Sequence, residues 1–174
     1  KGQIGIVSLD SNDIEMIDLT TVDKTRTYKE IHFSDTPIEI LDKTKSSSFA
    51  IEMALDAGRI IAAADSLGAS QAMINKAVEY SKERKQFNRV IGSFQAVKHM
   101  CAEMAAELEP CYSLVWHAAH SFDDSSEDAR LMACLAKSHI SEVSKMVSKK
   151  ATEVHGGMGF TDLLGLHFWF KRIG

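Results

Sequence analysis

Apolar residues recur at the spacing of an α-helix through most of the chain after residue 45, and this pattern limits the fold more than any other feature. The predicted helices cover residues 46–85, 94–122, 127–155 and 163–173. Serines at the start of the first helix and an Asp-Asp-Ser-Ser cluster before the third are suited to cap them. Because the connections are short, consecutive helices should pack antiparallel. The sequence therefore predicts a bundle of three long helices and one short one.

The residues expected along the helical stripes are mostly aliphatic or small. They are Met53, Ala57, Ile60, Ile61, Ala64, Leu67, Ile74 and Ala77 in the first helix, Val97, Cys101, Met104, Leu108, Cys111 and Val115 in the second, and Leu131, Cys134, Leu135, Met146 and Val154 in the third. Pro110 should kink the second helix, since proline removes a backbone donor and clashes with the preceding turn.

Residues 1–44 have the character of strands. Residues 4–9 are rich in β-branched side chains, residues 27–33 alternate with the period of two of a half-buried strand, and a short apolar run follows Pro37. So few strands need another sheet or a helical layer to cover them. The predicted fold class is α+β, mainly α, with part of an antiparallel β-domain at residues 1–44 and an antiparallel four-helix bundle at residues 45–174.

Composition excludes several classes of protein. The 174 residues carry a net charge of −4 and have a pI near 6.0, which argues against a nucleic-acid-binding protein. No apolar run is long enough to span a membrane. The three cysteines, Cys101, Cys111 and Cys134, all fall in helical patterns and are interpreted as small core residues, which favours the cytoplasm or another reducing compartment. Because the chain opens at Lys1 inside strand-like sequence, we expect it to be the tail of a longer protein.

Glycines are concentrated at one corner of the predicted bundle. Gly156, Gly157 and Gly159 lie between the third and fourth helices. Glycine permits positive φ and leaves room for a ligand to approach the main chain, so this turn is a candidate binding site. The alternative is that Gly156 and Gly157 only cap a helix. The spacing does not match a dinucleotide-binding Gly-x-Gly-x-x-Gly motif, and a helix rather than a strand precedes it.

Basic residues gather at the end of the first helix. Lys82, Arg84, Lys85 and Arg89 lie within eight residues, together with Phe87. In an acidic protein such a cluster is suited to a phosphate or pyrophosphate. The alternative is a solvated helix end, where cations are favoured by the helix dipole. A metal site is not expected, since no Glu-x-x-His pair occurs and the two histidines His117 and His120 have no carboxylate at suitable spacing.

Three segments in order resemble the signatures of the acyl-CoA dehydrogenase family. They are Leu-Asp-Ala-Gly-Arg at residues 55–59, Tyr-Ser-Lys-Glu-Arg-Lys-Gln-Phe at 80–87 followed by Ile-Gly-Ser-Phe-Gln at 91–95, and His-Gly-Gly-Met-Gly-Phe at 155–160. Residues 23–26 also resemble the end of the family's β-domain. The resemblance covers essentially the whole chain and implies an acyl-CoA dehydrogenase-like fold.

The resemblance implies that FAD lies between a β-domain and a helical bundle, completed by the bundle of a neighbouring subunit in a homo- or hetero-oligomer, a dimer or tetramer. Arg84 would then contact the pyrophosphate of the partner's FAD and Gln95 its adenine end. The other implied contacts are Phe87, Glu153, Gly156 and Gly157. Family members often carry glutamine at the position of Glu153, and glycine at that of Asn88.

The implied reaction is α,β-dehydrogenation of an acyl-CoA, with an electron-transfer flavoprotein or a similar acceptor as partner. A carboxylate must remove the α-proton. The resemblance places this base at Leu163, or in a minority of the family at Gly58, and neither side chain accepts a proton. Asp162 is the nearby carboxylate, and the alternative is that it caps the last helix with Thr161. By the same resemblance Asp56, Arg59 and Leu163 help bind acyl-CoA, although Asp56 and Arg59 are equally suited to a buried ion pair.

Four functional hypotheses remain open. The first is an active acyl-CoA dehydrogenase that uses Asp162 or a base supplied from elsewhere. The second is a subunit without a base that completes the FAD site of a catalytic partner, as in some steroid-degrading members of the family. The third is an enzyme in which the base has been replaced, and the fourth is a helical interaction module that binds no nucleotide.

Overall fold

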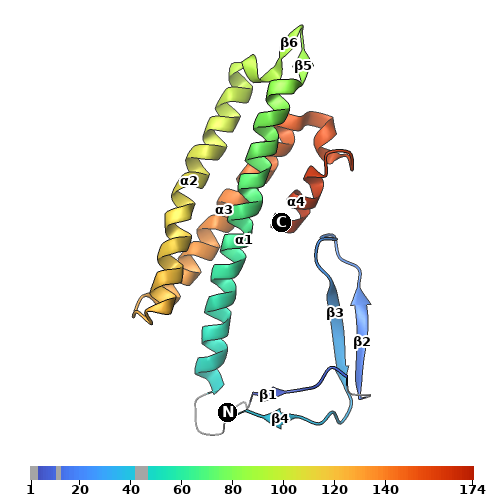
Figure 1. Cartoon of the computed structure of the whole chain (residues 1–174), viewed down its shortest axis with the longest axis vertical. Coiled ribbons are helices and arrows are strands. Elements are labelled where there is room, and N and C mark those ends of the chain that lie inside the picture. Colours follow the sequence, from blue (N-terminus) through green and yellow to red (C-terminus); the bar gives the residue numbers. More distant parts are fainter. Residues whose placement is uncertain (1–3, 11–12, 42–46) are drawn as a thin grey trace. The chain divides into compact units, whose positions relative to one another are not determined.

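The computed structural model describes residues 4–10, 13–41 and 47–174 (Figure 1). The chain separates into two compact units, Lys1–Leu55 and Asp56–Gly174. The first helix, α1 (Ser47–Glu83), begins in the first unit and continues through the second.

The first unit contains two antiparallel strand pairs. Strand β1 (Gly5–Ile6) pairs with β4 (Glu39–Ile40), and β2 (Ile14–Leu19) pairs with β3 (Tyr28–Phe33). The predicted strands at both ends of the unit are present but shorter than expected, and the sequence analysis missed β2. The prediction that residues 27–33 form a half-buried strand was wrong about burial, because all six residues of β3 are exposed. With Met16, Ile17 and Phe33 exposed as well, these strands still need the covering layer that the sequence predicts.

The second unit is helical, with a small hairpin at one end. After α1 come β5 (Lys85–Gln86), β6 (Arg89–Val90), the 3₁₀ turn η1 (Ile91–Ser93), α2 (Gln95–Asp123), α3 (Ala129–His155), the 3₁₀ segment η2 (Gly156–Phe160) and α4 (Leu166–Ile173). In Figure 1 the three long helices lie side by side and the β5–β6 hairpin caps the end where α1 stops. The predicted fold class, mainly helical with a four-helix bundle, is confirmed.

The bundle core combines a few large side chains with many small ones. Met73, Met104, Leu108, Ile140 and Leu166 are fully buried. Alanines between them allow the helices to approach closely. The buried alanines are Ala63, Ala69, Ala77, Ala118, Ala133, Ala136 and Ala151.

The predicted inward face was right for the second helix and wrong for the start of the third. Met104, Leu108 and Cys111 are buried, whereas Leu131, Cys134 and Leu135 are exposed. In α3 the buried stripe is formed instead by Ala133, Ala136, Ile140, Val143, Val147, Ala151 and Val154. The buried positions at the start of α3 are alanines, so the prediction based on larger side chains selected the wrong face. Met53, Ile61 and Ala64 of α1 are exposed as well.

Several predicted helix boundaries are also corrected. Helix α1 ends at Glu83 rather than residue 85, and the connection from α1 to α2 contains β5, β6 and η1. Helix α3 begins two residues later than predicted and α4 three residues later. Helix α2 continues through Pro110 without interruption. The proposed cap at Ser46 lies outside the described residues.

No helix in the described part of the chain has the length and apolar character needed to cross a membrane.

Ion pairs and hydrogen bonds connect α1 to each of the other helices. The Asp65 carboxylate accepts from Arg172 of α4 at Oδ2 (3.0 Å) and Oδ1 (2.7 Å). The Asp56 carboxylate accepts from Arg130 of α3 at 3.2 Å. On α2, the Tyr112 hydroxyl donates to Gln71 at 3.1 Å. These contacts set the register of α1 against the bundle.

Replacing Ile140 by alanine should destabilise the helical unit by about 2–5 kcal/mol, because the side chain is fully buried and its removal leaves a cavity. Leu131→Ala on the same helix is the matched control and should cost within about 0.5 kcal/mol, since Leu131 is exposed. Urea unfolding of the two variants measures both values. Equal losses would contradict the assignment of the inward face of α3.

Candidate functional site

The basic cluster predicted from the sequence forms the end of α1 and the hairpin that follows. The hairpin pairs Lys85 with Val90 and Gln86 with Arg89, so Phe87 and Asn88 are the two turn residues. Both have positive φ, 51° and 61°, as in a type I′ turn. Asparagine tolerates this conformation, whereas for phenylalanine it costs about 1–2 kcal/mol.

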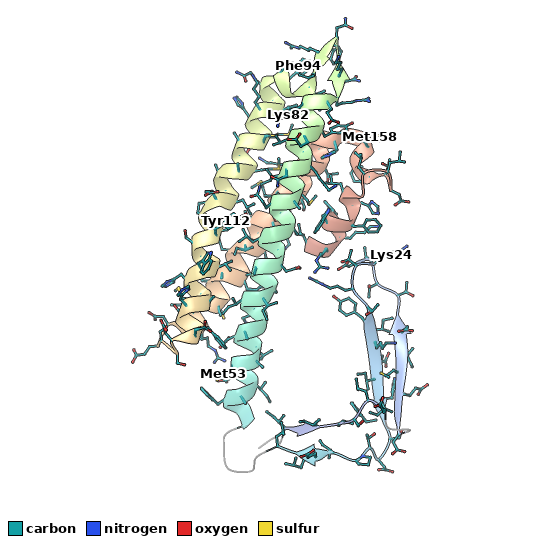
Figure 2. All side chains as sticks on the ribbon, in the orientation of Figure 1. Lys24, Met53, Lys82, Phe94, Tyr112 and Met158 are labelled. Atoms are coloured by element: carbon teal, nitrogen blue, oxygen red, sulfur yellow. The ribbon has the colours of Figure 1, made fainter. Side chains whose placement is uncertain are left out.

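The contacts of the Phe87 ring with the described residues offset little of this conformational cost. It is 86% exposed and makes an edge contact with Phe94, with ring centroids 6.1 Å apart. On the other side, the Arg89 guanidinium lies 3.9 Å from the centroid of the Phe94 ring. Figure 2 shows Phe94, Lys82 and Met158 at the same end of the helical unit. A strained turn that displays an exposed aromatic ring is typical of a contact surface.

The cations of the cluster have different surroundings. Lys82 pairs with Glu79 at 2.7 Å and Arg89 packs on Phe94. Arg84 is exposed and has no ion pair with any residue that the structure describes. Its backbone is fixed, because its N–H donates to the Tyr80 carbonyl (2.9 Å) and its carbonyl accepts from the Ile91 N–H (2.8 Å). Arg84 is therefore an exposed cation of this cluster with a fixed backbone, and its side chain is able to bind an anion.

The three glycines of this corner differ in their backbone conformation and in the space around them. Gly156 ends α3 with a φ of 58°, which disfavours any side chain. A Cβ on Gly159 would lie 3.0 Å from the Thr152 carbonyl oxygen, so this residue is needed for packing. Gly157 has an ordinary φ, and a Cβ there would meet nothing within 4 Å. Gly156 thus caps α3, in line with the alternative interpretation. A Cβ on Gly156 or Gly157 would stand in open space, so the main chain is accessible from that side.

One cavity of about 400 Å³ connects the two predicted binding segments. Its lining residues are Tyr80, Arg84, Gln86, Ile91, Glu153, Val154, His155, Gly156, Gly157 and Met158. The structure therefore brings together four of the six predicted cofactor residues, Arg84, Glu153, Gly156 and Gly157. Phe87 and Gln95 are exposed and do not line it. No role was predicted for Tyr80, Gln86 or His155. The one feature of the sequence that could have indicated them is their position inside the matched motifs.

A second cavity of about 410 Å³ adjoins the same segment. It is lined by Lys149, Thr152, Glu153, Gly156, Phe160 and Phe170. Glu153 and Gly156 line both cavities. The end of α3 therefore separates a cavity that contains Arg84 from one that contains two aromatic rings.

His155 lies buried at the first cavity and is held in one orientation. Its Nδ1–H donates to the Ala151 carbonyl at 2.7 Å, which leaves the lone pair on Nε2. The ring stacks on Tyr80 with centroids 4.6 Å apart. Burial lowers the pKa of His155 and the charge of Lys76 lowers it further, while the hydrogen bond to Ala151 opposes the shift. The imidazole is thus neutral near pH 7.

The candidate base positions carry no free carboxylate. Leu163 is 82% exposed, and Gly58 is exposed with open space around it. Asp162 is fully accessible and pairs with His167, with 3.1 Å between Oδ1 and Nε2. The interpretation of Asp162 and Thr161 as helix caps was wrong. Gly165, with a φ of 63°, precedes α4, and the Thr161 hydroxyl donates to the Met158 carbonyl instead.

The predicted substrate residues Asp56 and Arg59 form an ion pair with each other. Asp56 is buried, and its second oxygen accepts from Arg130. This arrangement is that of the structural ion pair considered as the alternative. Among the described residues, no group of three or more histidine, cysteine, aspartate or glutamate side chains is placed to hold a metal ion.

Comparison with known proteins identifies the family. The model for the C-terminal domain of acyl-CoA dehydrogenases matches residues 49–173. The chain is 42% identical over 106 residues to the caffeyl-CoA reductase-Etf complex subunit CarC of Acetobacterium woodii, covering 61% of this chain and 28% of that protein. It is 36% identical over 145 residues to the 3-(aryl)acrylate reductase of Clostridium sporogenes, covering 83% and 37%.

The solved structure of butyryl-CoA dehydrogenase from Megasphaera elsdenii matches with a TM-score of 0.90 and 26% identity, over 98% of this chain and 46% of that one. The chain spans about a third of the length of these curated relatives and just under half of that structure. The resemblance seen in the sequence motifs is confirmed. The chain belongs to the acyl-CoA dehydrogenase family.

Proposed function

We propose that this chain is the C-terminal part of an FAD-dependent oxidoreductase that acts on the α and β carbons of an acyl-CoA thioester, and that its helical unit completes the FAD site of a neighbouring subunit. The observation that carries this proposal is that Arg84 and the Gly156–Gly157 turn line one cavity. In this assignment residues 1–44 are the end of a β-domain and residues 45–174 the bundle domain. The protein would work in a reducing compartment such as the cytoplasm.

The residues at the cavity suit the diphosphate part of a dinucleotide. The Arg84 guanidinium can bind phosphate oxygens with two parallel hydrogen bonds. Gly156 and Gly157 leave open space where a side chain would stand, so a ligand can approach the main chain. The Phe87 ring, exposed on its strained turn, would pack on another part of the cofactor, and Gln95 would contact the adenine end. When bound, FAD supplies the acceptor for hydride.

The reaction also needs a carboxylate that exchanges a proton with the α-carbon while hydride leaves the β-carbon. Asp162 pairs with His167 and is shorter than glutamate, and Leu163 has no proton acceptor. We therefore assign the base to a residue outside residues 1–174. The names of two relatives describe reductions, which are the same hydrogen transfers in the opposite direction. Because one of them is a subunit of an Etf complex, an electron-transfer flavoprotein is the partner that we propose.

The second candidate function is a subunit that has no base of its own and completes the FAD site of a catalytic partner. Leucine at position 163 and glycine at position 58 favour it. The two candidates differ in what the purified protein does alone. An enzyme bleaches its flavin with a suitable acyl-CoA, whereas a subunit without a base does so only after its partner is added.

Arg84→Ala should weaken FAD binding by the full-length protein about 10- to 100-fold, because one hydrogen-bonded charge contact is worth about 1.5–3 kcal/mol. Lys82→Ala is the matched control, since this cation is two residues away and already pairs with Glu79. Titration of the apoprotein with FAD measures both constants. If the two variants lose the same small amount, Arg84 does not bind the cofactor.

Phe87→Gly should stabilise the helical unit by about 1 kcal/mol and weaken FAD binding at the same time. Glycine removes the cost of a positive φ, while the exposed ring that would contact the cofactor is lost. Thermal unfolding without FAD and FAD titration report the two effects separately. A variant that gains stability and keeps full FAD affinity would exclude Phe87 from the site.

Asp162→Asn should leave flavin bleaching by a suitable acyl-CoA within about threefold of the parent protein, because Asp162 is not the assigned base. Stopped-flow absorbance of the flavin measures the rate. Loss of bleaching by several orders of magnitude with unchanged FAD content would make Asp162 the base and contradict our assignment.

A further inference from the structure

We propose that His155 is a positioning residue: its ring, stacked on Tyr80, sets the separation between Arg84 and the Gly156–Gly157 turn. The inference rests on the proposed FAD site, because these two groups are the halves of that site. Neither His155 nor Tyr80 needs to touch the cofactor for this role. His155 is buried and Tyr80 half-buried, and both line the same cavity as Arg84 and the glycines.

The first half of the site is tied to Tyr80. Tyr80 and Arg84 are one helical turn apart, and the Arg84 N–H donates to the Tyr80 carbonyl at 2.9 Å. The Tyr80 ring is therefore attached to the same last turn of α1 that carries the guanidinium. A displacement of this ring moves the end of α1 and Arg84 with it.

The second half of the site is tied to His155. This residue is the last of α3 and directly precedes Gly156. Behind it, Gly159 of η2 approaches so closely that an added Cβ would lie 3.2 Å from the His155 Cβ and 3.1 Å from the Thr152 methyl group. The glycine turn is thus packed against the backbone side of His155, while the ring extends to α1.

The stack between the two rings joins the halves. The centroids lie 4.6 Å apart with 26° between the ring planes, a separation within the range of favourable aromatic contacts. The hydrogen bond from Nδ1 to the Ala151 carbonyl prevents the imidazole from turning away. Since α1 and α3 come from distant parts of the sequence, this contact fixes the width of the cavity at its end.

The role requires an uncharged imidazole. From α1, Lys76 places a positive charge near the ring and Tyr80 covers one face, while Arg84 of α1 and Glu153 of α3 line the same cavity. The neighbouring η1 and η2 segments contain no titratable side chain. A proton on His155 would therefore add a buried charge near Lys76, and burial lowers the pKa of His155 accordingly.

Four variants of the full-length protein test the proposal by FAD titration at pH 7.5. His155→Leu and Tyr80→Leu remove the stack and should each weaken FAD binding about two- to tenfold, the range expected for one aromatic pair. The double variant should lose no more than about twofold beyond either single one, because both remove the same contact. Tyr80→Phe keeps the ring and is the control, with affinity within about twofold of the parent protein.

The pH profile supplies a readout that a purely structural role would not move. In the parent protein FAD affinity should stay constant down to about pH 6.5, the usual pKa of histidine, and should fall only at lower pH, because the folded protein lowers the pKa of His155. His155→Phe keeps a stacked ring without a titrating group, so its affinity should stay level into the acid range. The free energy of unfolding should also decrease as the pH falls below about 6.5, because the unfolded chain then binds a proton that the folded chain resists.

The outcomes separate this inference from the function on which it rests. If the parent protein binds no FAD, the proposed function fails. If the parent binds FAD and both leucine variants bind it equally well, His155 is not a positioning residue. The proposal would also be overturned if the losses of FAD affinity were additive in the double variant, or if the FAD affinity of His155→Phe still fell at acid pH. Should His155→Leu not fold, Tyr80→Leu and His155→Phe still decide it.

Discussion

The parallel packing of α1 against α3, each of which lies antiparallel to α2, is the contact on which the rest of the helical unit depends. Between the two helices, small residues replace large ones, and the Ser144 hydroxyl reaches the Ser66 carbonyl of α1 at 3.4 Å. Close approach of this kind fixes the axial register of two helices more tightly than flexible aliphatic chains would. The ion pair between buried Asp56 and exposed Arg130 supports that register at one end, and the His155–Tyr80 stack supports it at the other.

This register explains how two segments about 70 residues apart come to share a cavity. The last turn of α1 supplies Arg84 and the last turn of α3 supplies the glycine corner, although the chain travels the length of the bundle twice between them. The two ends then differ in chemistry. One offers a guanidinium that forms no ion pair with the residues described by the structure, and the other offers two glycines with open space where a side chain would stand. A ligand that joins an anionic group to an extended, planar group could contact both the guanidinium and the glycine turn.

Much of the fold could be predicted from the sequence, because helical periodicity and short polar connections leave few arrangements. Residues 27–33 were recognised as a strand from their alternation, but their exposure depends on what covers them, which the local pattern cannot report. Leu131 and Leu135 were assigned to the core because they are large, whereas the structure uses Ala133 and Ala136. The β5–β6 hairpin was missed because Phe-Asn is an unusual pair for two positive φ values. At the site, Arg84 and the glycines were found through motifs, while His155 and Tyr80 gain their role only from a contact across the bundle.

The most direct test of this account is a structure of the full-length protein with FAD bound. It predicts that the Arg84 guanidinium lies within about 2.7–3.2 Å of the pyrophosphate oxygens of a cofactor held mainly by a neighbouring subunit, with the Gly156–Gly157 turn against the same cofactor. The account is contradicted if Arg84 and this turn face solvent, remote from any flavin and from any contact between subunits.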